Sequence, residues 1–103
     1  MIKPTNKRSD NMVKTLNELN RAMNKQQITF GDKQTFETYE DVYQFVATHK
    51  ILDISSKLNF DVNGNQILHE LYTKDDKLYE LETLYNKDNV FLHVMATEII
   101  ETK

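Results

Sequence analysis

The chain has 103 residues, contains no cysteine and carries a formal net charge of −3 at pH 7. This length suits a single domain, and the lack of cysteine excludes disulfides, thiolate catalysis and thiolate zinc sites. No apolar run approaches a membrane span and the first 25 residues lack the apolar core of a signal peptide, so we expect a cytoplasmic protein without a membrane partner.

The charge is distributed unevenly along the chain. Residues 1–34 contain seven Lys or Arg and three Asp or Glu, a balance of +4, whereas residues 35–103 contain six and thirteen, a balance of −7. Residues 1–8 combine one proline with three basic residues and show no periodicity, which predicts a flexible basic arm. Residues 9–103 are then expected to form one α+β domain.

The segment that follows the arm has apolar residues at the spacing of a helix. Ser9 or Asp10 is a suitable N-cap for a helix that runs to about residue 25, and its apolar positions recur at helical intervals. The core stripe is predicted to contain Met12, Leu16, Leu19 and Met23, while Lys14, Arg21 and Lys25 fall on other faces and should contact water.

The next segments predict a small hairpin and a second helix. Residues 27–30 and 34–37 have the composition of short strands, and residues 31–33 have that of a turn. Thr38 followed by Asp41 resembles a capping box and predicts a helix that ends near residue 50. Its buried stripe would contain Val42, Phe45 and Val46.

Strands are expected in the second half of the chain. Residues 52–62 alternate between apolar and polar side chains, and Asn63-Gly64 predicts a two-residue hairpin loop that places Phe60 opposite Ile67 and Asp53 opposite Lys74. Further strands over residues 77–85 and 89–100 complete a four-stranded antiparallel meander. We expect both helices to pack on one face of this sheet, which gives a two-layer α+β fold.

The loop after residue 72 decides which side chains share a face, because a shift of one residue inverts a strand. If Thr73 pairs with Lys77, then Tyr79 and Leu81 join the core with Val94. If Thr73 pairs with Leu78, then Glu80 and Glu82 turn into the core, where an unpaired carboxylate is costly. The first register is therefore the prediction.

The rejected register carries a chemical alternative. It would align His69, Glu82 and His93 across three adjacent strands, a set that could bind zinc or act as a general base. Because the predicted register separates them, we expect no metal, no cofactor and no catalytic residues. An enzyme is therefore the third choice among the functional classes.

The predicted register leaves an apolar, acidic sheet face away from the helices, which suggests contact with a protein partner or a second copy of the chain. The face would comprise Leu68, Glu70, Tyr72, Leu78, Glu80, Glu82, Leu84, Phe91, His93 and Met95. The predicted function is that of a small non-enzymatic binding protein of phage or mobile-element type, which inhibits or regulates a host enzyme. That enzyme could process nucleic acid, as in anti-CRISPR inhibition.

The alternative is a regulator that binds nucleic acid through its basic N-terminal residues. Those residues are Lys3, Lys7, Arg8, Lys14, Arg21 and Lys25. Against this alternative stand the acidic body of the chain and the lack of a recognition-helix or aromatic-basic motif on the strands.

Overall fold

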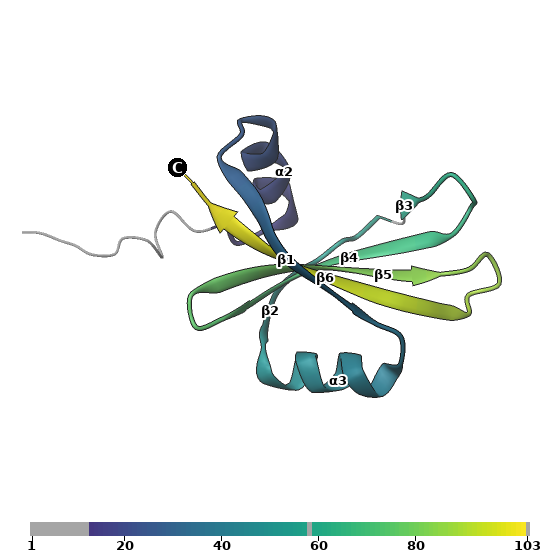
Figure 1. The fold of residues 1–103 in the computed structure, drawn as a ribbon. Coiled ribbons are helices and arrows are strands. Elements are labelled where there is room, and N and C mark those ends of the chain that lie inside the picture. Colours follow the sequence, from purple (N-terminus) through teal and green to yellow (C-terminus); the bar gives the residue numbers. More distant parts are fainter. Residues whose placement is uncertain (1–12, 58, 103) are drawn as a thin grey trace, which may run out of the picture.

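The computed structural model describes residues 13–57 and 59–102. In chain order the elements are α2 (Leu16–Asn24), β1 (Ile28–Phe36), α3 (Tyr39–Thr48), β2 (Lys50–Ile54), β3 (Asn59–Phe60), β4 (Gln66–Lys74), β5 (Lys77–Tyr85) and β6 (Phe91–Glu101) (Figure 1). The α+β class is as predicted. The predicted arm and the caps Ser9 and Asp10 lie outside the described residues. The predicted start of the first helix is wrong, because α2 begins at Leu16 with Thr15 as its N-cap.

Within the described residues, six strands form one antiparallel sheet in the order β1-β6-β5-β4-β2, and β3 pairs with β4 beyond the end of β2. The meander of β4, β5 and β6 matches the sequence prediction. The prediction of four strands is wrong, because the segment 52–62 divides into two short strands and β1 adds to the far edge.

Strand β1 replaces the small hairpin predicted over residues 27–37. It runs through residues 31–33 with only a bulge, between Phe30 and Lys33. The glycine that suggested a turn instead permits close packing, because a Cβ on Gly31 would lie 3.0 Å from Ile100 Cδ1 and 3.2 Å from Glu98 Oε1. The hairpin prediction was therefore wrong, because Gly31 lies in a bulge of one continuous strand.

The hairpin at Asn63-Gly64 exists, but its loop is longer than predicted. Asp61 organises residues 61–65: its Oδ1 accepts hydrogen bonds from the backbone N–H groups of Asn63 and Asn65, at 2.8 and 2.9 Å. As a result Phe60 pairs with Gln66 instead of Ile67. Asp53 lies opposite Leu71 instead of Lys74, because the register shifts by two further residues between β3 and β2.

The β4–β5 register is the one that the sequence analysis rejected. Asp75 and Asp76 have φ angles of 54° and 65°, the left-handed conformation of both central residues in a two-residue hairpin loop. Lys74 therefore pairs with Lys77 and Thr73 with Leu78. Leu71 then shares a face with Glu80, whereas Tyr72 shares the opposite face with Tyr79.

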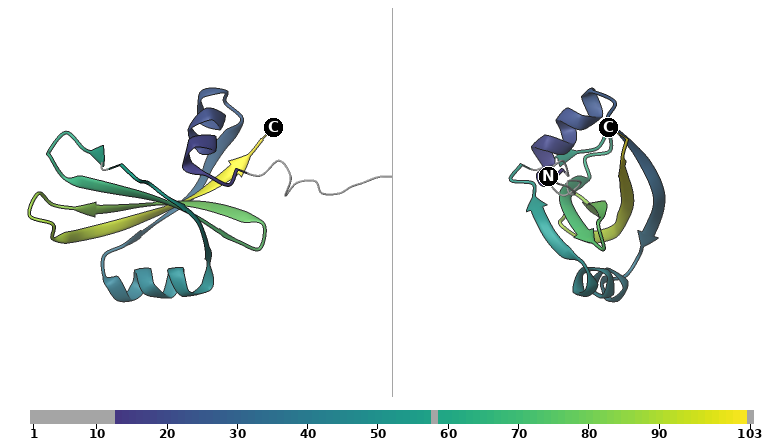
Figure 2. Two further views of the ribbon diagram at one scale, coloured as in Figure 1. Left: turned by 180° about the vertical axis from the view of Figure 1, so that it is seen from behind. Right: turned by 90° about the vertical axis from the view of Figure 1, so that its left-hand side faces the viewer.

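The two helices cover opposite faces of the sheet, so the predicted two-layer packing is wrong (Figures 1 and 2). Helix α2 packs on the face formed by Leu71, Leu78 and Ile99. Helix α3 packs on the other face, against a core of Tyr72, Leu81, Val94 and Ala96, through Val42, Phe45 and Val46 as predicted. We call these the α2 face and the α3 face.

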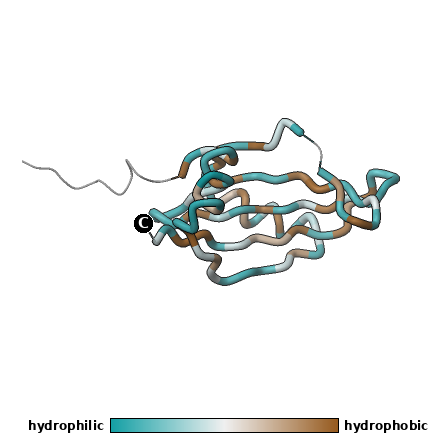
Figure 3. The backbone as a smooth tube through the Cα atoms, turned by 90° about the horizontal axis from the view of Figure 1, so that it is seen from above, coloured by the Kyte–Doolittle hydropathy of each residue, from teal (hydrophilic) through white to brown (hydrophobic). Residues whose placement is uncertain are grey.

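Coverage of both faces explains the register. Apolar and polar segments both occur along the strands (Figure 3). Apolar residues also occupy adjacent positions, such as Leu71-Tyr72 in β4, and a core on each side of the sheet can bury both side chains of such a pair. Helix α3 links β1 and β2, the two edges of the main sheet path, and contacts both strands. Among the described residues, neither helix has the length and apolarity needed to cross a membrane.

Candidate functional site

The structure divides the predicted docking residues between the two faces. Leu68, Glu70 and Tyr72 lie on the α3 face by register, and Phe91 packs against the core of that face. The other six lie on the α2 face, where Leu78 is 1% exposed in the core: Leu78, Glu80, Glu82, Leu84, His93 and Met95. The single surface predicted from the sequence is therefore wrong, because it rested on the wrong register.

The α3 face nevertheless carries an apolar surface around Glu70. Ile54 is paired with Glu70 and is half exposed, and Phe60 from β3 is more exposed still. At the other side Tyr39 stacks on Phe91 with ring centroids 4.3 Å apart. We call this set the tyrosine–glutamate surface; its members are Tyr39, Ile51, Ile54, Phe60, Leu68, Glu70, Tyr85 and Phe91.

Glu70 is the charged group at the centre of this surface. Burial raises the pKa of its carboxyl, although a hydrogen bond from the Tyr72 hydroxyl at 3.5 Å lowers it. Burial also raises the pKa of Tyr72 to about 12, and the nearby Glu70 charge adds to that rise. A carboxylate that is half removed from water among apolar side chains attracts a cation or a hydrogen-bond donor from a partner.

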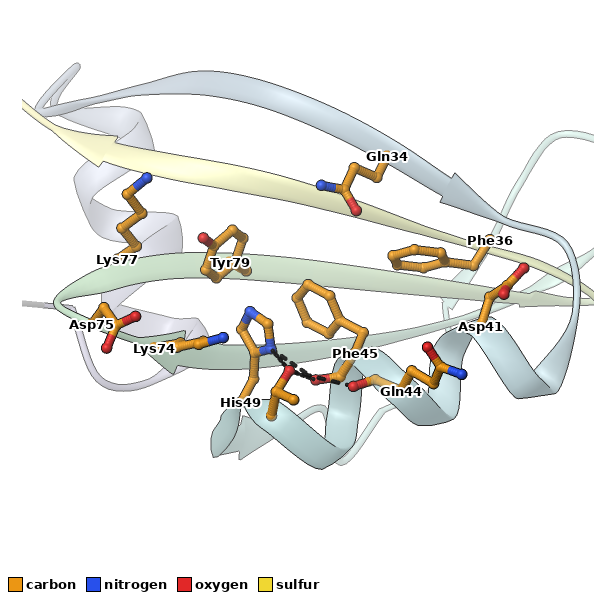
Figure 4. A pocket seen from close by; sticks show the side chains of 11 residues that line it. Gln34, Phe36, Asp41, Gln44, Phe45, His49, Lys74, Asp75, Lys77 and Tyr79 are labelled. Carbon is orange, nitrogen blue, oxygen red and sulfur yellow. Dashed lines mark hydrogen bonds between the residues drawn. The ribbon is translucent and has the colours of Figure 1, made fainter.

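A cleft opens beside α3, between the helix, β1 and the β4–β5 turn (Figure 4). Its volume is about 640 Å³, within the size range of ligand pockets. Phe36, Phe45 and Tyr79 form its aromatic floor, and its rim is polar. The rim residues are Gln34, Asp41, Gln44, Thr48, His49, Lys74, Asp75 and Lys77.

His49 has a fixed orientation in this cleft. Its ring stacks on Phe45 at a centroid distance of 3.7 Å, and its Nδ1 lies 2.7 Å from the Phe45 carbonyl oxygen. A carbonyl only accepts hydrogen bonds, so Nδ1 carries the hydrogen and the neutral ring has an acceptor at Nε2. This second nitrogen points into the cleft, toward Tyr79 (Figure 4). The cleft can therefore bind a small aromatic or hydrogen-bonding group.

A polar cluster lies on the α2 face between β4 and β5. The Nδ1 atom of His69 lies 3.0 Å from Glu80 Oε2 and 3.6 Å from Glu82 Oε2. The hydrogen bond with Glu80 raises the pKa of His69, and the two carboxylate charges add to the rise, against burial, which lowers it. His93 pairs with Leu84, two residues beyond Glu82, and Glu82 pairs with Met95, so the row of His69, Glu82 and His93 expected of the rejected register is not formed.

The basic residues of the nucleic-acid alternative are only partly described. Lys3, Lys7 and Arg8 lie outside the described residues. Lys14 precedes α2, Arg21 is in its last turn and Lys25 is its C-cap, and all three are exposed, as predicted. Three exposed cations provide few phosphate contacts.

Two of these structural features were not predicted from the sequence. The cleft was missed because α3 was expected on the same face as α2. The carboxylate pair around His69 was missed because Asp75-Asp76 was not recognised as a two-residue turn, although aspartate tolerates positive φ and that signal was present in the sequence. No protein-family model, characterised protein or solved structure matches the chain significantly.

Proposed function

We propose that this chain is a non-enzymatic binding protein that inhibits or regulates another protein, and that the tyrosine–glutamate surface is its docking site. The observation that carries the proposal is the exposure of large apolar side chains around a half-buried carboxylate. Ile54 is 51% exposed, Phe60 is 61% exposed and Tyr39 is 63% exposed. Aromatic side chains are enriched at protein interfaces, and tyrosine is common among the few residues that supply most of the binding energy.

The chemistry of the surface specifies the partner. Glu70 is surrounded by apolar groups, and residues 35–103 carry a balance of −7. The complementary surface therefore presents a lysine or arginine among apolar side chains, which would pair with Glu70 as the apolar rim excludes water. Enzymes that act on nucleic acid have such basic surfaces, and inhibition of a host enzyme of this kind is the proposed role.

Strand β2 supports the same site. It is the last strand on its side of the sheet path, so one row of its backbone groups is open to a partner strand. Ile51 and Ile54 project from this edge on the α3 face, by their pairing with Tyr72 and Glu70. A partner segment that added to β2 would gain backbone hydrogen bonds and these two apolar contacts together.

Differential capture tests the proposal. The wild type, Ile54→Asp and Lys25→Asp are immobilised and exposed to a bacterial lysate in high salt, with folding checked by circular dichroism. Both variants gain negative charge, but Lys25 is the C-cap of α2, which packs on the opposite face of the sheet. A partner retained by the wild type and Lys25→Asp but lost from Ile54→Asp supports the site. Equal retention by all three chains contradicts it.

The same three samples also test the alternative that the chain binds nucleic acid through its basic residues. Binding of a DNA or RNA duplex that falls steeply with salt, and is lost in Lys25→Asp but kept in Ile54→Asp, would assign function to the basic residues instead.

A further inference from the structure

The cluster on the α2 face has an unbalanced charge. Glu80 and Glu82 project from β5 toward His69 on β4, and the side chains of Glu80 and Glu82 are only 17% and 34% exposed. Over residues 13–57 and 59–102, His69 is the only side chain within ion-pair distance of either carboxylate. Two half-buried carboxylates therefore share at most one positive charge, and a neutral imidazole supplies none.

No lysine or arginine of the sheet supplies the missing charge. By register the nearest basic residue on this face is Lys33, which pairs with Thr97, while Thr97 pairs with Glu80. Lys33 is thus two strands away from Glu80 and is exposed to solvent. The cluster keeps an excess negative charge in a partly desolvated position, which favours the binding of a cation.

The spacing of the three side chains matches a transition metal. One ligand atom from each of His69, Glu80 and Glu82 can be chosen so that all three lie within 4.8 Å of one another. The two nitrogen–oxygen separations are 3.0 and 3.6 Å. A tetrahedral zinc ion with ligand bonds of roughly 2.0–2.2 Å holds neighbouring ligand atoms about 3.4 Å apart. The two observed separations bracket this spacing.

We propose that His69, Glu80 and Glu82 form a zinc-binding site. One imidazole and two carboxylates favour zinc over magnesium or calcium, which prefer oxygen ligands alone. The three protein ligands leave the fourth position of a tetrahedral ion to water. All three project from directly paired strands, with His69 opposite Glu82, so the protein holds the ligands in place before the metal arrives.

The site is reachable and separate from the proposed docking surface. His69 is 23% exposed, which leaves a path for the ion from solvent. The tyrosine–glutamate surface lies on the opposite face of the same two strands, because Glu70 and His69 are adjacent in β4. Zinc would cross-link β4 and β5 beneath that surface and stabilise the native state by mass action.

Calorimetric titration tests the proposal. Zn²⁺ is titrated into the untagged full-length chain after treatment with a chelator, at neutral pH. We expect one ion per chain. His69→Gln and Glu82→Gln should each weaken binding at least about 100-fold, since loss of an outer-shell partner alone costs about 10–100-fold. Circular dichroism checks that both variants fold, and Glu80→Gln replaces either variant if it does not fold.

Two matched variants act as controls. His93→Gln removes an imidazole from the same face, and Glu98→Gln removes a carboxylate that lies outside the cluster on β6. Both should bind zinc within about twofold of the wild type, and zinc should raise the unfolding midpoint of the wild type and of both controls only. Absence of stoichiometric zinc binding, or equal binding by the cluster variants and the controls, would overturn the proposal.

Discussion

The two helices differ in how completely they cover the sheet. Helix α2 has a full capping box, in which Thr15 Oγ1 accepts from the Glu18 N–H and the Glu18 carboxylate accepts from the Thr15 N–H, and it buries Leu19 and Ala22. Every residue of α3 is described and none is buried, and its N-terminus has a single side-chain cap. Helix α2 therefore seals a core, whereas α3 leaves surfaces free for contact on either side.

The largest effect should come from the core beneath α2. Leu19 is 1% exposed, so Leu19→Ala should lower the free energy of unfolding by about 3 kcal/mol, through lost burial and the cavity that remains. Val46→Ala in α3 should cost about 1 kcal/mol, because that side chain is only half buried. Urea denaturation measures both values. Equal costs would show that the helices are equally important to the core.

A tertiary cap should give the next largest effect. Asp53 Oδ2 accepts a hydrogen bond from the Leu16 N–H at 2.8 Å, which ties the first turn of α2 to strand β2. Asp53→Ala should therefore cost about 1–2 kcal/mol, because it leaves that donor without its partner. Asp41→Ala is the control on α3, where the Asp41 side chain is exposed. Thermal unfolding compares the two, and an Asp53→Ala cost no larger than the control would contradict this role.

The smallest effect concerns Glu70 and depends on pH. Burial raises its pKa above the ordinary value of 4.5, so the folded state binds the proton more tightly than the unfolded state does. Stability then falls as pH rises from the ordinary value through the raised folded value, and the full cost is present at neutral pH. Glu70→Gln removes this cost.

Unfolding by urea at several pH values measures the Glu70 effect. Glu70→Gln should be slightly more stable than the wild type at pH 7, and the two proteins should converge below about pH 4, where both side chains are neutral. A difference that is constant across this range, or a less stable variant at pH 7, would show that Glu70 is not desolvated on the α3 face.

Local signals in the sequence predicted only part of the local structure. Thr38 and Asp41 fixed the start of α3, because a side-chain cap is decided within four residues, and the alternation of apolar residues predicted the meander. The register at Asp75-Asp76 was missed because it depends on two backbone angles. The hydrophobic pattern could not predict this register, since a sheet covered on both faces buries apolar side chains that point to either side.

The candidate sites were harder to predict than the fold. Each combines residues from strands whose relative position depends on that register and on the path of α3. His69, Glu80 and Glu82 meet only when Thr73 pairs with Leu78, and Ile54 lies opposite Glu70 because the register shifts between β3 and β2. Such small register shifts leave little trace in composition or periodicity, and so the docking surface predicted from the sequence combined residues from both faces.

Hydrogen exchange of the complex tests whether the partner docks on the α3 face. The partner identified by differential capture is purified, and amide exchange is measured for the free and bound chain. We predict slower exchange in β2 and α3 on binding, over Lys50–Ile54 and Tyr39–Thr48, with no change in α2. Protection confined to α2, over Leu16–Asn24, would contradict the account and assign binding to the opposite side of the sheet.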